Sequence, residues 1–114
     1  MNVFSINEKD KMKEFLYEIS LIHDSNIVSI AIKDDAMEMF LENKYKKQNF
    51  KLMFSNIKEM HFYNEIIYYE SDEIIHLFFD DESKEDNENL RLFLEKVSGQ
   101  RIHIVCKTFA FDEL

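Results

Sequence analysis

The hydrophobic period of this chain changes once, near residue 26, and this change limits what each part can form. Between residues 7 and 19, four apolar side chains recur at helical spacing: Met12, Phe15, Leu16 and Ile19. Asn7 before them is a suitable N-cap. From residue 26 onward the period is two, and β-branched and aromatic residues dominate. The pattern predicts an α+β fold, an N-terminal helix packed on a mainly antiparallel β-sheet.

The alternating part of the chain divides into short segments separated by polar turn residues. The expected strands are residues 27–33, 36–42, 50–54, 59–63, 66–70, 74–79 and 101–111. Val28, Ile30 and Ile32 share one side of the first strand. Asp34 and Asp35 predict a tight turn after it, and Ser55-Asn56 predicts a break between two later strands. The spacing favours a meander of about seven or eight strands, with the apolar runs at 66–69 and 74–79 in central positions.

Residues 88–98 fit two secondary structures. Leu90, Phe93, Leu94 and Val97 would share a helical face, whereas Leu90, Leu92 and Leu94 would share a strand face. We favour the strand, because Gly99 then supplies a turn that joins it to the extended segment 101–111. A helix that ends at Gly99 remains the alternative.

The chain has 114 residues, 46% of them hydrophobic, with no proline and one glycine. We expect a single domain spanning residues 1–114. The start of the sequence lacks the apolar run of a signal peptide, and no apolar run approaches the length that spans a bilayer. Cys106 cannot form an internal disulfide as the lone cysteine, and with these features it predicts a cytoplasmic protein.

Charge is the most informative feature for function. The formal net charge is −9. Residues 1–57 carry eight lysines against nine acids, whereas residues 58–114 carry six basic side chains against fourteen acids. Such a field repels nucleic acid and anionic membranes and attracts basic proteins. We therefore expect a basic protein partner, although acidity alone also keeps small proteins in solution.

His23 and Asp24 form a doublet that metal-dependent phosphohydrolases use to bind metals, so a hydrolase is one alternative. Such an enzyme needs further ligands at helical spacing, and His61, His76 and His103 lie in strand-like segments. The doublet fits a turn better, with the side chains of residues 24–26 bonding nearby backbone and His23 partly buried. No catalytic constellation, metal or cofactor is predicted, and we expect a protein that is not an enzyme.

Three stretches together suggest a family: the His-Asp doublet followed by IVSIAIK, the step Phe54-Ser55-Asn56-Ile57, and the closing hairpin LRLFLEKVSGQRIHIVCKTF. In this order they resemble a family of small bacterial immunity proteins from polymorphic-toxin systems. The resemblance covers residues 15–110. It implies a stoichiometric inhibitor that binds a cognate toxin, often a basic nuclease. A phage-encoded inhibitor of a host defence nuclease would have the same acidity and is the main alternative.

An acidic face could replace the phosphates that a nuclease engages, so we expect the binding surface where acids are densest. The acidic candidates are Glu70, Asp72, Glu73, Asp80, Asp81, Glu82, Glu85, Asp86 and Glu88. Tyr63, Tyr68 and Tyr69 are candidate aromatic anchors. Packing in the core or on the sheet is the alternative role for these tyrosines.

Overall fold

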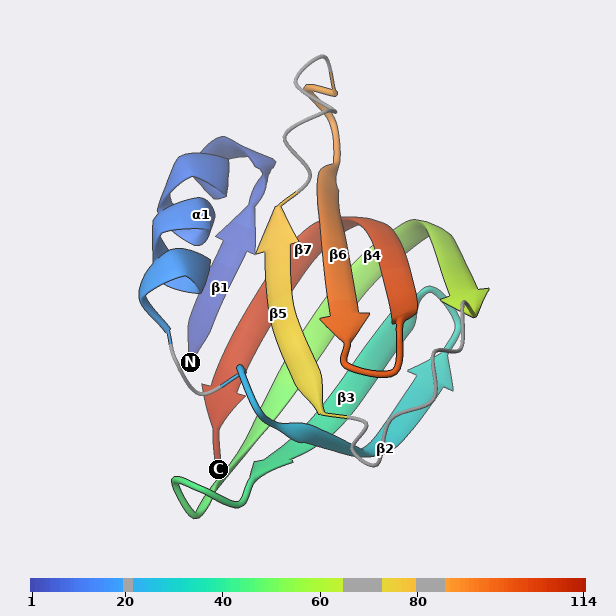
Figure 1. Cartoon of the computed structure of the whole chain (residues 1–114). Coiled ribbons are helices and arrows are strands. Elements are labelled where there is room, and N and C mark those ends of the chain that lie inside the picture. Colours follow the sequence, from blue (N-terminus) through green and yellow to red (C-terminus); the bar gives the residue numbers. More distant parts are fainter. Residues whose placement is uncertain (20–21, 65–72, 80–85) are drawn as a thin grey trace.

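The computed structural model describes residues 1–19, 22–64, 73–79 and 86–114 (Figure 1). The predicted strand at residues 66–70 lies outside them. The elements, in chain order, are β1 (Asn2–Ser5), the 3-10 turn η1 (Ile6–Glu8), α1 (Lys9–Glu18), β2 (Asn26–Lys33), β3 (Ala36–Asn43), β4 (Gln48–Asn64), β5 (Ile74–Phe79), β6 (Leu90–Lys96) and β7 (Gln100–Glu113). The predicted class, one N-terminal helix with an antiparallel sheet, is confirmed.

The order of the strands corrects the predicted meander. Among the described residues, one continuous path holds six strands in the order β2-β3-β4-β7-β6-β5, and β1 pairs with β7 outside this path. Every pairing is antiparallel. The long β7 pairs with β4 on one edge and with β6 and then β1 on the other. β5 therefore lies at an end of the described path, and the central position predicted for it is wrong.

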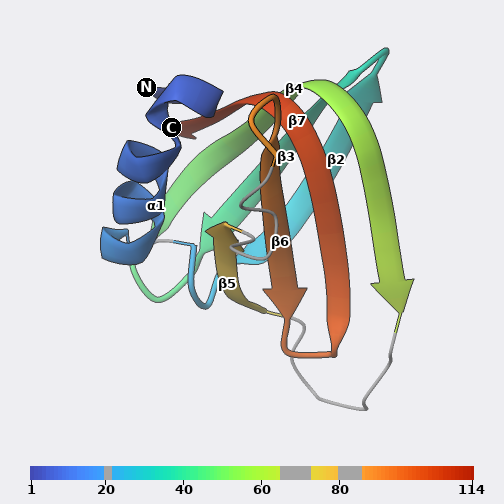
Figure 2. The same ribbon diagram turned by 90° about the horizontal axis from the view of Figure 1, so that it is seen from above.

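The predicted break at Ser55-Asn56 is also wrong, because β4 continues through it for 17 residues. Asn56 adopts a φ of 53°, a conformation that asparagine tolerates better than most residues. The pairing with β7 shifts register between Ile57 and Glu59. A shift of this kind bends a strand without ending it, and Figure 2 shows β4 and β7 curving together.

The predicted helix forms, and it begins with a different cap from the one expected. The backbone N–H and the hydroxyl of Ser5 both donate to the Glu8 carboxylate, so Ser5 rather than Asn7 marks the entry to η1 and α1. Met12 is fully buried. The ring of Phe15 lies 5.3 Å from Phe4 on β1 and 5.4 Å from Phe111 on β7. Aromatic contacts therefore fix α1 against the end of the sheet where β1 and β7 pair.

One face of the sheet forms the core. β3 contributes Met37, Met39 and Leu41, and β4 contributes Phe50, Leu52 and Phe54. Leu90, Leu92 and Leu94 are fully buried on β6, so the choice of a strand for this segment is confirmed. Gly99 has a φ of 91° in the turn from β6 to β7, where a side chain would be unfavourable.

Candidate functional site

Four of the twelve predicted partner-binding residues lie in the described part of the chain: Tyr63, Glu73, Asp86 and Glu88. The other eight lie outside it: Glu70, Asp72, Asp80, Asp81, Glu82, Glu85, Tyr68 and Tyr69. Glu73 precedes β5, and Asp86 and Glu88 precede β6. Because β5 and β6 are antiparallel, these acids lie at opposite ends of one hairpin. The structure therefore does not bring the described acids together in one patch.

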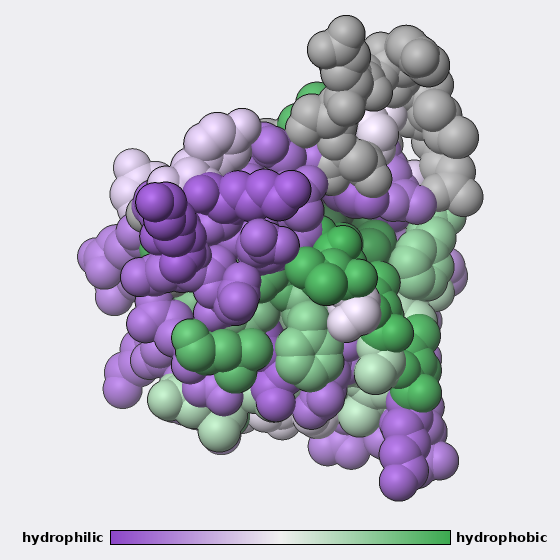
Figure 3. Space-filling view, turned by 90° about the horizontal axis from the view of Figure 1, so that it is seen from below, coloured by the Kyte–Doolittle hydropathy of each residue, from purple (hydrophilic) through white to green (hydrophobic). Residues whose placement is uncertain are grey.

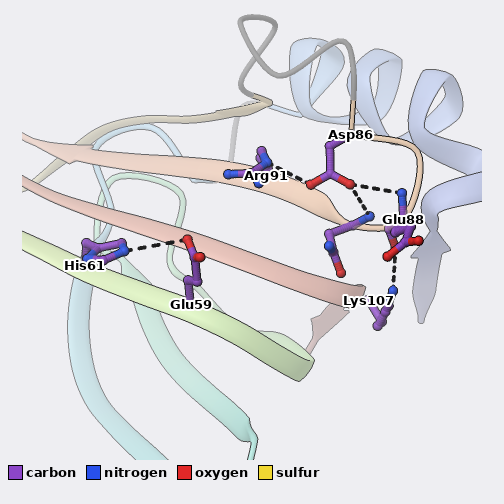
Figure 4. A network of polar contacts seen from close by, with 7 residues as sticks. Glu59, His61, Asp86, Glu88, Arg91 and Lys107 are labelled. Carbon is purple, nitrogen blue, oxygen red and sulfur yellow. Dashed lines mark hydrogen bonds and ion pairs between the residues drawn. The ribbon is translucent and has the colours of Figure 1, made fainter.

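Asp86 is the centre of a polar network at the start of β6 (Figure 4). Its Oδ1 accepts the backbone N–H groups of Glu88 at 2.9 Å and Asn89 at 3.0 Å, and its Oδ2 accepts Nε of Arg91 at 2.8 Å. Partial burial disfavours the charged carboxylate, but these three donors outweigh it and lower the pKa of Asp86. The Asp86 side chain is 14% exposed. Asp86 therefore organises the chain before β6, with its charge balanced by Arg91.

Glu88, another predicted partner-binding residue, is held in place by hydrogen bonds of its backbone. The Glu88 carbonyl accepts a hydrogen bond from Nζ of Lys107 on β7 at 2.8 Å. The Glu88 side chain is left at an exposed position. Of these two acids, Glu88 is the one that a partner could reach.

Glu73 contacts a residue far away in the sequence. Its carboxylate accepts a hydrogen bond from the Tyr45 hydroxyl at 3.0 Å, and its carbonyl accepts the N–H of Val97 at 2.8 Å. The side-chain hydrogen bond and the nearby negative charge both raise the pKa of Tyr45. This contact links the turn between β3 and β4 to the start of β5.

Tyr63 lies near the end of β4 with 49% of its surface exposed, so this tyrosine is not a core residue. It lines a pocket of about 240 Å³ together with Phe93, Gly99 and Arg101. On the same outer face, the rings of Phe93 and His103 stack at 4.2 Å, and His61 lies 6.2 Å from His103. Tyrosine and arginine are common at protein interfaces. Tyr63 therefore remains a candidate anchor.

The His-Asp doublet lies in the turn before β2. The Nδ1 of His23 is 3.0 Å from the Asp24 carboxylate, and Asp24 adopts a φ of 67°. The buried Asn43 donates to the His23 carbonyl at 3.1 Å, which fixes the turn against β3. The His23 side chain is 59% exposed, so its predicted partial burial is wrong. Among the described residues, no group of three or more His, Cys, Asp or Glu could hold a metal ion.

Cys106 is the remaining group with reactive chemistry. It lies on β7 and is fully buried in the core. Burial raises the pKa of its thiol to about 12. The thiol is therefore neutral at physiological pH, and it acts as a small apolar side chain in the core.

Sequence reasoning missed an exposed apolar surface on β2. Ile30 pairs with Met39 and Ile32 pairs with Met37, so both isoleucines share the core face of the sheet. Met39 and Met37 are almost fully buried, whereas Val28 is 63%, Ile30 40% and Ile32 56% exposed. β2 lies at the lower edge of Figure 1, and hydrophobic side chains gather there in the view from below (Figure 3). We call Ile30 and Ile32 the β2 face.

The β2 face was not recognised in the sequence because alternation shows which side chains share a face but not whether anything covers them. Among the described strands, β2 is hydrogen-bonded to β3 alone. Acidic residues flank it, with Asp24 before the strand and Asp34 and Asp35 after it. The exposed apolar side chains of β2 therefore lie between acids at both ends of the strand, with Lys33 at its last position and Lys44, Lys46 and Lys47 in the turn after β3.

The described strands form a curved antiparallel sheet with α1 packed against the end where β1 and β7 pair, and with β2 and β5 at the two ends of the strand path. In the described part of the chain, no helix is long and apolar enough to cross a membrane. Neither a scan against protein-family models nor a search of curated proteins found a match to this chain.

Proposed function

We propose that this chain is a cytoplasmic inhibitor of the immunity-protein kind, which neutralises a basic protein partner by stoichiometric binding. The partner would be a cognate toxin, for which a nuclease is the best candidate. The chain would act by occupying the partner's active site or an essential surface, and not by catalysis.

The observation that carries the proposal is the amount of negative charge and its uneven distribution. The net charge is −9, and residues 58–114 supply fourteen acids against six basic residues. A nuclease surface is built to attract phosphates, so a protein with this field meets it quickly and competes with its substrate. The resemblance to immunity proteins leads to the same role independently of the charge.

The described acids show which carboxylates are available for such a role. Asp86 is occupied by three hydrogen bonds, whereas the side chain of Glu88 is exposed. Asp80, Asp81 and Glu82 lie just before this point in the sequence and add three further acids. We therefore place the electrostatic part of the proposed interface around the segment that connects β5 and β6.

Affinity capture of the tagged chain from its native cell, followed by purification of the captured protein, tests the proposal. We expect a basic protein that binds with one-to-one stoichiometry in calorimetry and loses its activity in the complex. Raising the salt concentration from about 50 to 500 mM should weaken binding at least about tenfold, since long-range attraction is screened. A captured protein that keeps full activity in the complex would exclude an inhibitor.

Charge reversal tests where the electrostatic interface lies. The triple variant Asp80→Lys, Asp81→Lys, Glu82→Lys should bind the captured partner at least about tenfold more weakly at low salt, with the difference shrinking at high salt. The matched control is Asp10→Lys, Glu14→Lys, Glu18→Lys, which makes the same change in net charge at exposed positions of α1. Equal weakening by the two variants would mean that net charge matters but this segment does not.

A further inference from the structure

The face of the sheet opposite the core carries a pocket where β4 ends and the turn from β6 leads into β7. Tyr63, Phe93, Gly99 and Arg101 line it, and its volume is about 240 Å³. Tyr63 and Arg101 are direct partners in the pairing of β4 with β7, so their side chains leave the sheet side by side. Phe93 stacks on His103 of the neighbouring strand at 4.2 Å, with the ring planes 8° apart. The pocket therefore combines two aromatic rings with a guanidinium.

The volume of this pocket limits what it can hold. A cavity of about 150 Å³ accepts one benzene ring, and pockets for drug-sized molecules begin at about 300 Å³. At about 240 Å³, the pocket admits a single ring with a short substituent. Aromatic side chains that fill pockets often supply much of the binding energy of a protein interface. The size therefore favours one aromatic side chain of a protein over a larger ligand.

The charges at the pocket favour a neutral occupant. Arg101 is the one charged side chain among the described residues that line it. Its Nε lies 3.2 Å from the Glu95 carboxylate on β6, so its positive charge is balanced. Lys96 alternates with Glu95 and leaves the other face of β6, where its Nζ donates to Gln100 at 3.1 Å. A charged ligand would have to compete with the pair of Arg101 and Glu95, whereas a neutral ring leaves it intact.

The hydrogen-bond chemistry of Arg101 selects among the aromatic side chains. A guanidinium has five N–H donors and no acceptor, and Glu95 engages the donor at Nε. The other donors favour an occupant that carries an acceptor. Phenylalanine has none and the tryptophan indole only donates, whereas the tyrosine hydroxyl oxygen accepts. A neutral histidine also accepts, but it offers less apolar area to the aromatic walls and becomes positive when protonated.

We infer that this pocket receives a tyrosine side chain of the basic partner. The inference deepens the proposed function and rests on it, because it adds an aromatic anchor to the electrostatic contact. Arg91, Phe93 and Glu95 alternate on the outer face of β6, and Arg91 binds Asp86 before that strand. Phe93 lies about 7 Å along the strand from Arg91. A standard interface covers roughly 800 Å² on each protein, so one partner surface spans both the pocket and the polar network.

The direct test titrates the intact chain with two capped amino acids, N-acetyl tyrosine amide and N-acetyl phenylalanine amide. In nuclear magnetic resonance spectra, we expect the largest shifts at the amides of Tyr63, Gly99 and Arg101. The tyrosine amide should bind at least about threefold more tightly, because the phenylalanine amide offers Arg101 no acceptor. Equal binding of the two amides, or shifts centred on another part of the chain, would overturn the inference.

Substitutions in the pocket separate the hydrogen bond from the aromatic contact. The double variant Glu95→Gln, Arg101→Met removes the donors together with the balancing acid, so it should lose the preference for the tyrosine amide. Glu95→Gln alone keeps the donors and should keep the preference. Tyr63→Ser removes an aromatic wall and should weaken both amides at least about threefold. Tyr17→Ser on α1 is the matched control, since Tyr17 is 92% exposed and lies outside the pocket; equal weakening by both serine variants would exclude the site.

Rings of similar size and different charge test whether the pocket prefers a neutral occupant. The original chain should bind phenylacetamide more tightly than phenylacetate or 2-phenylethylammonium. In Glu95→Gln the charge of Arg101 is no longer balanced, so phenylacetate should gain at least about threefold in affinity. If the original chain already prefers phenylacetate to phenylacetamide, the pocket takes an anion and the inference is wrong.

Two other occupants would give different results. A second copy brings the exposed Tyr17 and Tyr45, but its own net charge of −9 opposes association. A concentration-dependent dimer in sedimentation that Tyr63→Ser dissociates would show that a second copy occupies the pocket. Tyr68 and Tyr69 of this chain lie outside the described residues. If replacing both with serine raises the affinity for the tyrosine amide at least about tenfold, the chain's own tyrosine competes for the pocket. Either result would overturn the inference.

Binding to the captured partner separates this inference from the proposed function. Tyr63→Ser should weaken that binding at least about tenfold and leave its salt dependence unchanged, because the lost contact is apolar. If the Tyr63→Ser chain binds and inhibits the partner normally, the pocket is not the anchor and the proposed function stands. If the tyrosine amide binds as expected but no basic partner is inhibited, the tyrosine pocket is correct and the proposed function fails.

Discussion

The two ends of the sheet's core face are built from similar apolar side chains, but only one end is covered. At the β7 end, the ring of Phe109 lies 5.3 Å from Phe54 and 6.3 Å from Phe4, and Phe109 is fully buried. At the β2 end, Ile30 and Ile32 continue the same face but are 40% and 56% exposed. α1 and β1 cover the first end (Figure 1), whereas β2 has only β3 beside it among the described strands. The side chains of the covered end are buried in the core, whereas those of the β2 end are exposed to solvent.

The largest effect we predict is the contrast between substitutions at these two ends. Phe109→Ala should lower the free energy of unfolding by about 3–5 kcal/mol, because it removes a fully buried ring and leaves a cavity. Ile32→Ala should cost about 1 kcal/mol or less, since more than half of that side chain is already in water. Urea unfolding followed by circular dichroism measures both changes.

Phe109→Leu keeps the comparison testable if the alanine variant does not fold. It retains most of the buried volume, and we expect it to cost about 1.5 kcal/mol. An Ile32→Ala variant that loses as much stability as Phe109→Leu would show that the β2 end is covered in solution, and it would remove the contrast between the ends.

The contrast also explains how far the sequence could predict the fold. Period alone identified the helix and the strand segments within β3 and β4, because the alternation at residues such as Met39 and Leu52 follows directly from the pleat of a strand. For β6 the period fitted both a helix and a strand, and the turn at Gly99 favoured the strand. Period did not reveal that β4 pairs with β7, since pairing between distant strands depends on packing of the whole sheet. Asn56 illustrates the limit, because a residue typical of a turn here bends a continuous strand.

The candidate site was harder to predict than the fold. Charge identified acidic residues, but it could not show that Asp86 is occupied by Arg91 and two backbone N–H groups. It also could not show that Glu73 lies at the other end of the hairpin from Glu88, because strand direction decides this. The exposure of Ile30 and Ile32 depends on which strand is last in the sheet, a property of topology and not of local pattern.

A second, smaller effect concerns the polar network at one end of the β5–β6 hairpin. Asp86→Asn should lower the free energy of unfolding at pH 7 by about 1–2 kcal/mol, because it removes the ionised acceptor from the hydrogen bond with Arg91. The pKa of Asp86 is lowered in the folded chain, so its contribution is fully present above the unfolded value of 3.8. It is lost as the pH falls through the folded value. Unfolding measured across acidic pH should show the difference between the two proteins disappearing.

Glu88→Gln is the control for this network, since the contacts of Glu88 described above use its backbone and not its carboxylate. We expect it to change the free energy of unfolding by about 0.5 kcal/mol or less. A difference between the original chain and Asp86→Asn that persists unchanged at acidic pH would contradict the assignment of the effect to the ionised Asp86 carboxylate.

The smallest effect concerns the other end of the hairpin, where Tyr45 and Glu73 meet at an exposed contact. In the original chain, the hydrogen bond to Glu73 and the negative charge of Glu73 both raise the pKa of Tyr45. Glu73→Gln removes this charge and weakens this hydrogen bond. In the variant, the pKa of Tyr45 should therefore fall toward its ordinary value of 10.0. The free energy of unfolding should not change measurably, because the contact is exposed. Nuclear magnetic resonance titration of the tyrosine ring measures the shift.

Asp112→Asn on β7 removes an acid that pairs with Lys51 on β4 and does not contribute to the raised pKa of Tyr45, so it should leave that pKa unchanged. If Glu73→Gln has no effect on Tyr45 either, the turn between β3 and β4 is not linked to the start of β5 in solution. Without the contact between Tyr45 and Glu73, the start of β5 would be held less firmly than the start of β6, where Asp86 accepts three hydrogen bonds. Solvent screens the exposed contact of Glu73, whereas the partly buried carboxylate of Asp86 accepts three hydrogen bonds. We therefore expect Asp86 to contribute more to the free energy of unfolding than Glu73 does.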